Sequence, residues 1–573
     1  MLPRSGTPCP MALLGALAVL IMLEVNRLAA HDRPCGPLRK SRSAVMARHG
    51  MAATSQPLAT AVAIRVLQDG GNAVDAAIAA NAVLSVVEPM SCGPGGDLFA
   101  IVWDAETRKL HGLNASGRAP HAATLESFRS KGLDLIPTHG PLSWSVPGCV
   151  DGWDQLRTRF GTKSWAELLA PGIAYAEEGF PVTEIIADDW RDAAPLLARI
   201  PTSAACFLPG GRPPEAGAIF RNPGLARSMR LIARDGRDAF YRGPLADAMV
   251  AYSRQVGGLF ERRDFEDHTS TWVEPVSTNY RGHDVWELPP NGQGIATLQM
   301  LNLLESYDLK RMGPRSAESL HLMIESKKLA YEDRAKYYAD PEFARVPVAA
   351  LISKAYAAGR ARLIDPDHAS ERPMPGEPCE ADTIYLTVVD KDFNVVSLIQ
   401  SVFSGFGSYH VPDDLGFPLQ NRGCLFALDP SHANRLEPHK RPFHTIIPGF
   451  VTRDGNPWLS FGLMGGDMQA QGHAQVLCNL IDFGMDVQEA GDAPRFRHIG
   501  SSEPTGQRAR DGGTVALESG IGFEVRRALE AMGHRLVTIR GGFGGYQAIR
   551  IDVERGVLIG GSDPRKDGGA MGY

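Results

Sequence analysis

Thr383 is the residue of this chain that could act as a nucleophile with the fewest other catalytic side chains. It follows Asp382 near the start of the segment DTIYLTVVDKDFNVVSLIQS, residues 382–401. A threonine at a new N-terminus offers a hydroxyl nucleophile and an α-amine that can serve as its own base. A free α-amine titrates at about pH 8, so it can accept a proton near neutrality. A chain break before Thr383 would therefore create a catalytic group that needs no histidine.

The segment around Thr383 must hold it in a fixed place. Residues 384–389 and 394–399 are rich in β-branched and apolar side chains, and the turn-forming residues 390–393 separate them. This pattern predicts a β-hairpin. Both faces of the two strands are apolar, which predicts that the hairpin is buried on both sides. The preceding residues 366–382 are rich in Pro, Glu and Asp, and we expect an exposed linker in which a chain break is tolerated.

A pair of glycines, Gly465 and Gly466, is the second chemical candidate. It lies between a predicted strand that ends the segment WLSFGLM and a predicted helix over 467–482. Two consecutive backbone N–H groups at a helix N-terminus can bind an anion. Such a pair can also stabilise the oxyanion of an acyl-transfer intermediate. The alternative interpretation is an ordinary strand-to-helix turn.

Composition and charge exclude several classes of function. The 573 residues are 44% hydrophobic and 22% charged, with a net charge of −6, which is typical of a globular protein with a large core. No Lys/Arg run forms a basic stripe, so we expect neither nucleic acid nor an anionic membrane as a partner. The eight cysteines form no CxxC pair, and the histidines form no HExxH motif, so the sequence predicts no metal and no cofactor.

The N-terminus is open to two interpretations. Residues 11–25 are apolar and are followed by Leu28-Ala29-Ala30, which is typical of a signal peptide spanning residues 1–30. The apolar run is too short for a membrane span. In that case the mature protein is periplasmic or secreted. The alternative is an over-extended gene start, with Met46 close to the true beginning and a cytoplasmic protein.

Regular elements begin at about residue 43. We expect helices over 57–69 and 73–86, a strand over 98–103, and a long helix over 316–338 that Ser316 caps. Residues 150–260 have a mostly helical pattern. The glycine cluster at 93–96 precedes a strand instead of opening a helix, so it predicts a close approach of two backbones and not a phosphate loop.

Together these segments resemble the γ-glutamyltranspeptidase family of N-terminal-nucleophile hydrolases. The resemblance extends in order over almost the whole chain after residue 43. The matching stretches are GGNAVDAAIAANAVLSVVEPMSCGPGGDLFA (70–100), VPGCVDGW (146–153), ELPPNGQGIATLQMLNLLE (287–305), ESKKLAYEDRAKYYADP (325–341), DTIYLTVVDKDFNVVS (382–397), HKRPFHTIIP (439–448), GLMGGD (462–467) and GGSDPRKDGGAMGY (560–573).

The resemblance implies an α/β protein with a four-layer αββα sandwich, made as one proenzyme. It implies self-cleavage between Asp382 and Thr383, which gives a large fragment, 43–382, and a small fragment, 383–573. Both fragments would form one αββα domain and remain associated as a stable heterodimer. Thr383 would then attack a substrate amide and form an acyl-enzyme, which water or an amine releases.

The resemblance also implies roles for other residues. Gly465 and Gly466 match the oxyanion-hole glycines of the family. Ser401 stands where the family has a threonine that hydrogen-bonds the nucleophile. Thr445 and His444 occupy the positions of two serines that hold the substrate carboxylate.

The departures from the family pattern concern the substrate. Ser116 replaces an arginine that binds the substrate α-carboxylate, and Arg118 lies two residues away. Leu425 replaces the aspartate that accepts the α-ammonium, and Arg422 replaces a glutamine. Two charge-assisted contacts are lost, each contributing roughly 1.5–3 kcal/mol, so we expect weaker binding of glutathione. Arg422 or Arg118 could instead hold the carboxylate of another acyl group, as in the acylase-like and oxamate-amidohydrolase-like branch.

These observations predict an autocatalytically processed amidohydrolase or acyltransferase for a γ-glutamyl-like or other carboxylate-bearing acyl amide. A genuine glutathione hydrolase is the first alternative. An unprocessed, non-catalytic binding protein of the same fold is the second.

Overall fold

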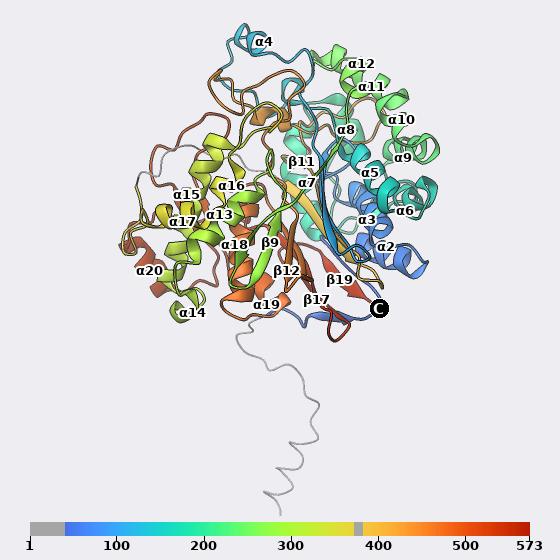
Figure 1. Cartoon of the computed structure of the whole chain (residues 1–573). Coiled ribbons are helices and arrows are strands. Elements are labelled where there is room, and N and C mark those ends of the chain that lie inside the picture. The colour runs from blue at the N-terminus through green and yellow to red at the C-terminus, as the bar shows by residue number, and fades with distance from the viewer. Residues whose placement is uncertain (1–39, 372–381) are drawn as a thin grey trace, which may run out of the picture. The chain divides into compact units, whose positions relative to one another are not determined.

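Two antiparallel seven-stranded sheets lie at the centre of the computed structural model, which describes residues 40–371 and 382–573, with the backbone alone for 382 and 383 (Figure 1). The predicted signal peptide and most of the predicted linker lie outside the described residues. Sheet 1 has the order β1 (Val45–Ala47), β18 (Val557–Ser562), β17 (Gly545–Asp552), β13 (Asn456–Met464), β12 (Gly449–Arg453), β9 (His283–Glu287) and β8 (Val276–Tyr280). Sheet 2 has the order β19 (Gly569–Gly572), β2 (Met51–Thr54), β10 (Asp382–Val389), β11 (Val395–Phe403), β3 (Asp97–Asp104), β4 (Lys109–Ala115) and β7 (Thr271–Val273).

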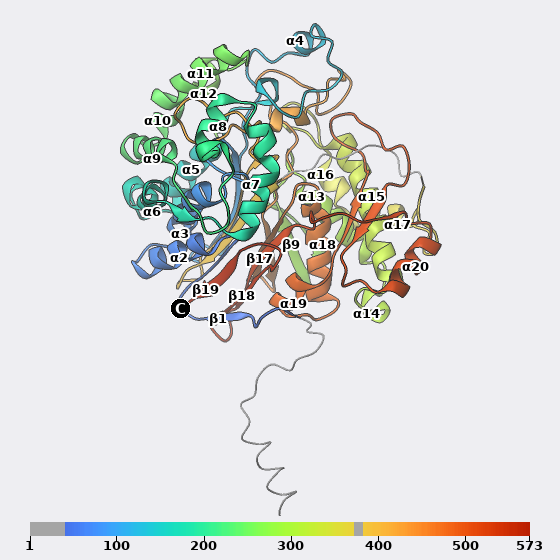
Figure 2. The same ribbon diagram turned by 180° about the vertical axis from the view of Figure 1, so that it is seen from behind.

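Three apolar clusters define the layers of the fold. The cluster between the sheets contains Phe99 and Ile399 of sheet 2 and Phe450 and Ile549 of sheet 1. The outer face of sheet 2 packs against helices α2 (Pro57–Gln68), α3 (Ala73–Val87), α5 (Cys149–Phe160) and α6 (Trp165–Glu178). The outer face of sheet 1 packs against α13 (Gly294–Leu304), α15 (Ala317–Tyr337) and α18 (Met468–Ile481). Figure 2 shows the helices on the two flanks with the strands between them, so the expected four-layer αββα sandwich is confirmed.

The hairpin predicted at 384–399 is present as β10 and β11. The two strands pair from Val389 opposite Val395 to Ile384 opposite Gln400. Residues 384–389 and every residue of β11 are buried. The hairpin has this environment because β2 and β3 pair with its two outer edges, while helices and sheet 1 cover its faces.

The other predicted elements are also found. The helices predicted at 57–69 and 73–86 are α2 and α3, and Asn72 caps α3 by accepting hydrogen bonds from Val74 and Asp75. The long helix α15 begins after Ser316, whose side chain accepts a hydrogen bond from the Ser319 N–H. Residues 150–260 are mostly helical, as expected. The helices beyond α6 in that stretch are α7 (Glu184–Leu197), α8 (Pro201–Phe207), α9 (Pro223–Asp235), α10 (Arg237–Tyr241) and α11 (Pro244–Val256).

The glycine cluster before β3 marks a close backbone approach. A Cβ atom on Gly95 would meet the carbonyl oxygen of Pro418, and one on Gly96 would meet that of Ser401. Only glycine allows such contact, which confirms the prediction. The approach brings the start of β3 against the end of β11, where Ser401 lies.

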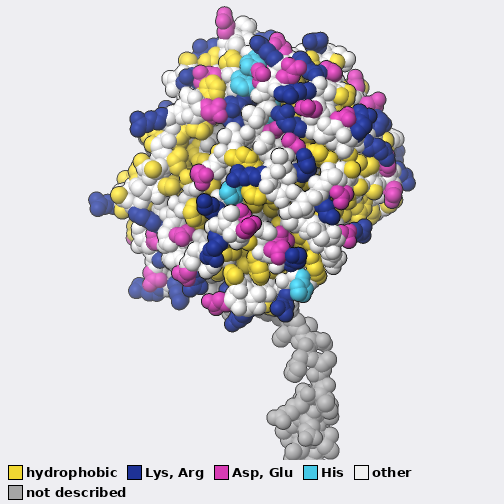
Figure 3. Space-filling model, turned by 45° about the vertical axis from the view of Figure 1, so that its right-hand side comes forward, with side chains coloured by type: hydrophobic (Ala, Val, Ile, Leu, Met, Phe, Trp, Pro, Cys, Tyr) yellow, Lys and Arg dark blue, Asp and Glu magenta, His cyan; other side chains and the backbone are white. Residues whose placement is uncertain are grey.

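A three-stranded sheet is separate from the two central sheets. A small sheet combines β14 (Phe496–Ile499), β15 (Thr514–Leu517) and β16 (Leu536–Val537), and α20 (Phe523–Ala531) lies between the last two in sequence. Positive and negative side chains are interspersed over the face in Figure 3. In the part of the chain that the structure describes, no helix is both long and apolar enough to cross a bilayer.

Candidate active site

Thr383 lies at the second position of β10, opposite an irregularity in β11. Asp382 pairs with Phe403 and Ile384 pairs with Gln400, so the two residues Ser401 and Val402 stand opposite the single residue Thr383. This is a β-bulge, and Phe403 at its end has a positive φ of 82°. Bulges are common beside active sites because they redirect side chains locally. The bulge places Ser401 opposite the Thr383 backbone, at the open end of the hairpin.

Ser401, Arg422 and Thr445 form one buried cluster. The Arg422 guanidinium donates from Nη1 to Thr445 Oγ1 at 2.6 Å and from Nη2 to Ser401 Oγ at 3.0 Å. It also lies over the Phe403 ring, 4.3 Å from the ring centroid. Arg422 is fully buried, and burial lowers the pKa of its guanidinium to about 9. The cluster therefore carries a buried positive charge beside the start of β10.

No carboxylate among the described residues forms an ion pair with Arg422. Its Nε atom is buried and has no hydrogen-bond partner among those residues. A buried guanidinium is normally paired, because an unpaired buried charge is costly. Arg422 therefore keeps the capacity to bind a carboxylate.

His444 interacts with Asp97 at the edge of this cluster. His444 Nε2 lies 3.0 Å from Asp97 Oδ2, while Asp97 Oδ1 accepts hydrogen bonds from the Gly117 and Gly148 N–H groups and from Gln420. Burial raises the pKa of Asp97 to about 7, although Arg422 and these donors oppose the rise. Burial and Arg422 hold the pKa of His444 well below its usual value. His444 is therefore a neutral side chain in contact with Asp97.

Gly465 and Gly466 form the turn between β13 and α18. Their φ angles are +117° and +55°. Their carbonyl groups accept hydrogen bonds from Met468 and Gln469, whereas their N–H groups donate to no other described residue. The expected strand, glycine pair and helix are thus present in order, and the geometry leaves two main-chain donors available.

A buried arginine holds this turn in place through Asp467 and Gln293. Arg334 of α15 bonds Asp467, the N-cap residue of α18, and donates to Gln293 Oε1 at 2.8 Å. Gln293 in turn donates to the carbonyl oxygens of Gly466, at 2.9 Å, and Thr445, at 2.7 Å. Two segments of the site are therefore connected through one amide side chain.

A cleft of about 980 Å³ borders Gly465. Tyr409 and Phe406 supply part of its apolar lining, and three aspartates of α7 (Asp188, Asp189 and Asp192) supply one acidic side. Arg540 and Lys566 lie on the other side and reach across it, to Asp188 at 3.6 Å and to Asp189 at 3.8 Å. Arg422 and Thr445 do not line this cleft. The site thus consists of an open cleft and a separate buried cluster.

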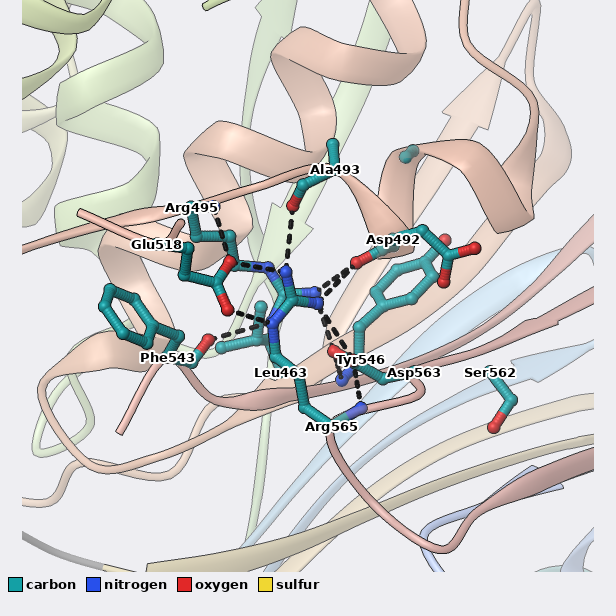
Figure 4. A network of polar contacts seen from close by, with 12 residues as sticks. Leu463, Asp492, Ala493, Arg495, Glu518, Phe543, Tyr546, Ser562, Asp563 and Arg565 are labelled. Atoms are coloured by element: carbon teal, nitrogen blue, oxygen red, sulfur yellow. Dashed lines mark hydrogen bonds and ion pairs between the residues drawn. The ribbon is translucent and has the colours of Figure 1, made fainter. Parts of the chain in front are cut away.

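A polar network includes Glu518, Phe543 and Arg565, which line the cleft (Figure 4). Asp563 accepts hydrogen bonds from Arg495 at 2.7 Å and from Arg565 at 2.9 Å. Arg565 also binds Glu518, and Arg495 donates to the Phe543 carbonyl. These contacts hold the loop that reaches Gly544, whose Cα would lie 3.3 Å from a Cβ atom added to Gly465.

Arg118 does not join the buried cluster. Its Nη2 lies 3.0 Å from both carboxylate oxygens of Glu342, and its Nη1 donates to the His439 carbonyl. Ser116 is buried and donates to Asn114, and Leu425 is part of the apolar core beneath sheet 1. Neither of the last two positions offers a charge to a substrate.

Sequence reasoning did not assign Asp97, Gln293 or Arg334. Each lies in one of the matching stretches, in GGDLFA, NGQG and YEDRAKYY. The available signal is a polar or charged residue beside apolar neighbours in an otherwise buried element, because such a side chain must find partners. The pattern does not say which partners these are.

Comparison with known proteins gives matches over almost the whole chain. The family model described as Gamma-glutamyltranspeptidase matches residues 59–573. The glutathione hydrolase-like YwrD proenzyme of Bacillus subtilis is 38% identical over 90% of this chain and 97% of its own length. Acylase ACY 1 proenzyme of a Pseudomonas species is 36% identical over 91% of this chain and 92% of its own length.

A solved structure is similar over almost the whole chain. The crystal structure of cephalosporin acylase from Bacillus halodurans has a TM-score of 0.87 and 40% identity, covering 95% of this chain and 99% of that chain. The fold, the position of the glycine turn and the extent of these matches lead to one conclusion: the chain is an amidohydrolase or acyltransferase that belongs to the γ-glutamyltranspeptidase family.

Proposed function

We propose that this enzyme cleaves its own chain before Thr383 and then acts on amides whose acyl group carries a carboxylate. The buried guanidinium of Arg422, which has no carboxylate partner among the described residues and lies beside the start of β10, is the observation that carries this proposal. The two relatives from Bacillus subtilis and Pseudomonas are named as proenzymes, which supports processing.

The first reaction is intramolecular. The Thr383 hydroxyl attacks the carbonyl carbon of Asp382 and the peptide C–N bond breaks, so that the acyl group moves from nitrogen to oxygen. Water then hydrolyses the ester. The products are the Asp382 carboxylate and a Thr383 residue with a free α-amine. Asp382 thus serves the processing step alone.

The second reaction uses the new terminus. The α-amine accepts the hydroxyl proton while the Thr383 oxygen attacks the substrate amide, and the N–H groups of Gly465 and Gly466 stabilise the oxyanion. The amine leaves with a proton, and an acyl-threonine remains. Water or a second amine releases the acyl group. Ser401 donates or accepts a hydrogen bond at the nucleophile, and Arg422 orients Ser401.

The charges of the site favour an acyl group other than γ-glutamyl. A γ-glutamyl group carries an α-carboxylate and an α-ammonium. Arg422 can bind the carboxylate, with the Thr445 hydroxyl as a neighbour and His444 nearby, whereas Leu425 offers nothing to the ammonium. Arg118 is neutralised by Glu342, which disfavours it as the anchor. A dicarboxylic acyl group such as glutaryl or succinyl fits this arrangement.

The size of the cleft supports a bulky amine as the leaving group. A volume of about 980 Å³ is at the upper end of the range for small-molecule sites. Gly465 and the charged side chains line the same cleft, so the amine portion would extend into it. The buried cluster would take the acyl portion.

Two measurements test this proposal. Intact-mass and N-terminal analysis of the purified protein should give two fragments with a new terminus at Thr383, and Thr383→Ala should give one uncut chain. The processed enzyme should hydrolyse glutaryl- and succinyl-p-nitroanilide at least tenfold faster, in kcat/KM, than γ-glutamyl-p-nitroanilide.

Each outcome has a separate meaning. A wild-type chain that remains intact would disprove the processing step. Strong turnover of the γ-glutamyl compound would show that a genuine glutathione hydrolase is the better assignment, as it is for the Bacillus subtilis glutathione hydrolase proenzyme, which is 32% identical to this chain. Fragments with Thr383→Ala would exclude that hydroxyl as the cleaving group.

A further inference from the structure

Three buried side chains outside the active site have the donor set of a transition-metal site. His321 and Glu325 are four residues apart on α15 and therefore lie on one face of the helix. His534 follows α20, and its Nε2 lies 2.8 Å from His321 Nδ1. One ligand atom of each side chain lies within 4.8 Å of the others, and all three residues are at most 4% exposed.

The orientation of His321 is fixed in the manner of a metal ligand. Its Nε2 lies 2.7 Å from the Asp365 carbonyl oxygen, which can only accept, so Nε2 carries the proton. Its Nδ1 therefore presents a lone pair, and that atom faces His534 Nε2 at 2.8 Å. Metal-binding histidines almost always use the second ring nitrogen in this way.

The ring orientation of His534 also suits a metal. Nε2 of His534 is the atom that faces His321 Nδ1, so it is the nitrogen that would ligate a cation. A neutral imidazole ligates a cation through the ring nitrogen that carries no proton. It needs only the tautomer that places its proton on Nδ1.

We propose that His321, Glu325 and His534 bind one divalent transition-metal cation, with Zn²⁺ as the best match. Two imidazole nitrogens and one carboxylate are a common zinc donor set, completed by water. Zinc-to-ligand distances of about 2.0–2.2 Å place tetrahedral donors about 3.3 Å apart, so the two nitrogens must separate by about 0.5 Å. Rotation of the two rings can provide this movement.

Lys328 is the competitor for Glu325. Its ammonium lies 2.6 Å from Glu325 Oε1 and 3.1 Å from the Ser370 carbonyl. In the metal-free protein it neutralises the carboxylate. When the cation binds, Lys328 retains its contact with Ser370. Removal of this ammonium should therefore strengthen metal binding, whereas a purely structural cluster would only lose stability.

The site would join the two fragments of the processed enzyme. His321 and Glu325 precede residue 382 and His534 follows it. Segment 365–370 is held at the same place, through Asp365 on His321, through Ser370 on Glu325, and through Ala369, which donates to the Met532 carbonyl. This consequence rests on the proposed cleavage, but binding of the cation itself does not.

The test is titration of Zn²⁺ into the purified, chelator-treated full chain, with calorimetry and with Co²⁺ absorption as a second readout. Wild type and the uncut Thr383→Ala variant should both bind one equivalent, so failure of processing does not affect the result. His534→Gln and Glu325→Gln should each weaken binding at least tenfold. His534→Gln retains a donor toward His321, and folding is checked by circular dichroism.

Two further variants separate this site from adventitious binding. His121 and His439 form a partly exposed stacked pair, with Asp267 beside His121. His439→Asn should leave the zinc affinity unchanged. Loss of zinc binding in that variant would overturn the proposal. Lys328→Met should tighten binding. Absence of stoichiometric binding in wild type, or unchanged binding in His534→Gln, would also overturn it.

Discussion

Arg422 is the residue that distinguishes this site most clearly. It is a buried cation that contacts two hydroxyl groups and one aromatic ring, without a carboxylate partner among the described residues. A substrate carboxylate would complete its contacts. The hydroxyls of Ser401 and Thr445 can reorient when that happens, because a hydroxyl group both donates and accepts.

Arg422→Met should reduce kcat/KM for a glutaryl amide about 10- to 100-fold. A hydrogen bond to a charged group contributes about 1.5–3 kcal/mol, and about 1.4 kcal/mol corresponds to a factor of ten. The uncharged butyryl amide should lose much less. Steady-state kinetics on fully processed enzyme gives both values, and an equal loss for the two amides would mean that Arg422 only positions Ser401.

Glu332 offers a test of burial on α15. Burial raises its pKa from 4.5 to about 7, while Ser502 opposes the rise with a hydrogen bond of 2.9 Å. The folded state therefore binds this proton more tightly than the unfolded state. Its contribution to stability is complete below about pH 4.5 and is lost as the pH rises through 7.

Glu332→Gln should remove this dependence, because glutamine resembles the protonated acid. The free energy of unfolding of Thr383→Ala minus that of the Thr383→Ala, Glu332→Gln double variant should fall by about 2–3 kcal/mol between pH 4.5 and 8. Urea unfolding of both proteins in the uncut Thr383→Ala background gives the comparison. A difference that stays constant with pH would contradict the raised pKa.

At the scale of elements, the β13–α18 turn depends on the backbone freedom of Gly465. Gly465→Ala combines a φ of +117° with a Cβ atom 3.3 Å from the Gly544 Cα. The turn must shift, and its N–H groups then leave the position of the oxyanion. Loss of one oxyanion donor typically lowers kcat 10²- to 10³-fold.

We therefore expect about a 100-fold lower kcat for Gly465→Ala, together with slower processing. Gly484→Ala is the matched control, because Gly484 also has a positive φ, of 64°, but has no atom near its missing Cβ. It should cost about 1–2 kcal/mol of stability and leave kcat unchanged. Similar kcat values for the two variants would disprove the oxyanion role.

The sequence predicted the elements around the site better than the contacts between them. The hairpin at 384–399 and the strand–glycine–helix order at 465–466 follow from local apolar patterns and from glycine. The link from Arg334 through Gln293 to Gly466 joins three segments that are distant in sequence. Local periodicity contains no information on such a link, so it became visible only in the folded chain.

The same limit applies to the substrate residues. The absence of a charged side chain at Ser116 and Leu425 could be predicted from the family pattern. In the structure, Ser116 donates to Asn114 and Leu425 lies in the apolar core. The pairing of Arg118 with Glu342 could not be predicted, because nothing in the sequence around either residue indicates the other. The roles of Thr383, Ser401 and Thr445 in catalysis stay predictions.

At the scale of the whole molecule, the position of β10 and β11 determines what cleavage can do. These strands lie between β2 and β3 in sheet 2. Strands that precede Thr383 and strands that follow it are therefore interleaved within one sheet. Sheet 1 also combines strands from both parts of the chain, since β1 pairs with β18 and β9 pairs with β12.

Cleavage should therefore leave the molecule in one piece. Size-exclusion chromatography with light scattering should give the same mass for wild type and for uncut Thr383→Ala, although a denaturing gel separates two fragments only for wild type. Elution of the fragments as separate species without denaturant would show that the interface is not a shared core.

The interleaving of early and late strands has a further consequence for inactivation by heat. Before cleavage, a melted chain can regain its sheets by a unimolecular route, although such distant pairing is slow. After cleavage, two polypeptides must meet again, so recovery becomes dependent on concentration and competes with aggregation. Durability of the mature enzyme would then be governed by how rarely it opens, and its lifetime at a given temperature would describe it better than an equilibrium melting point.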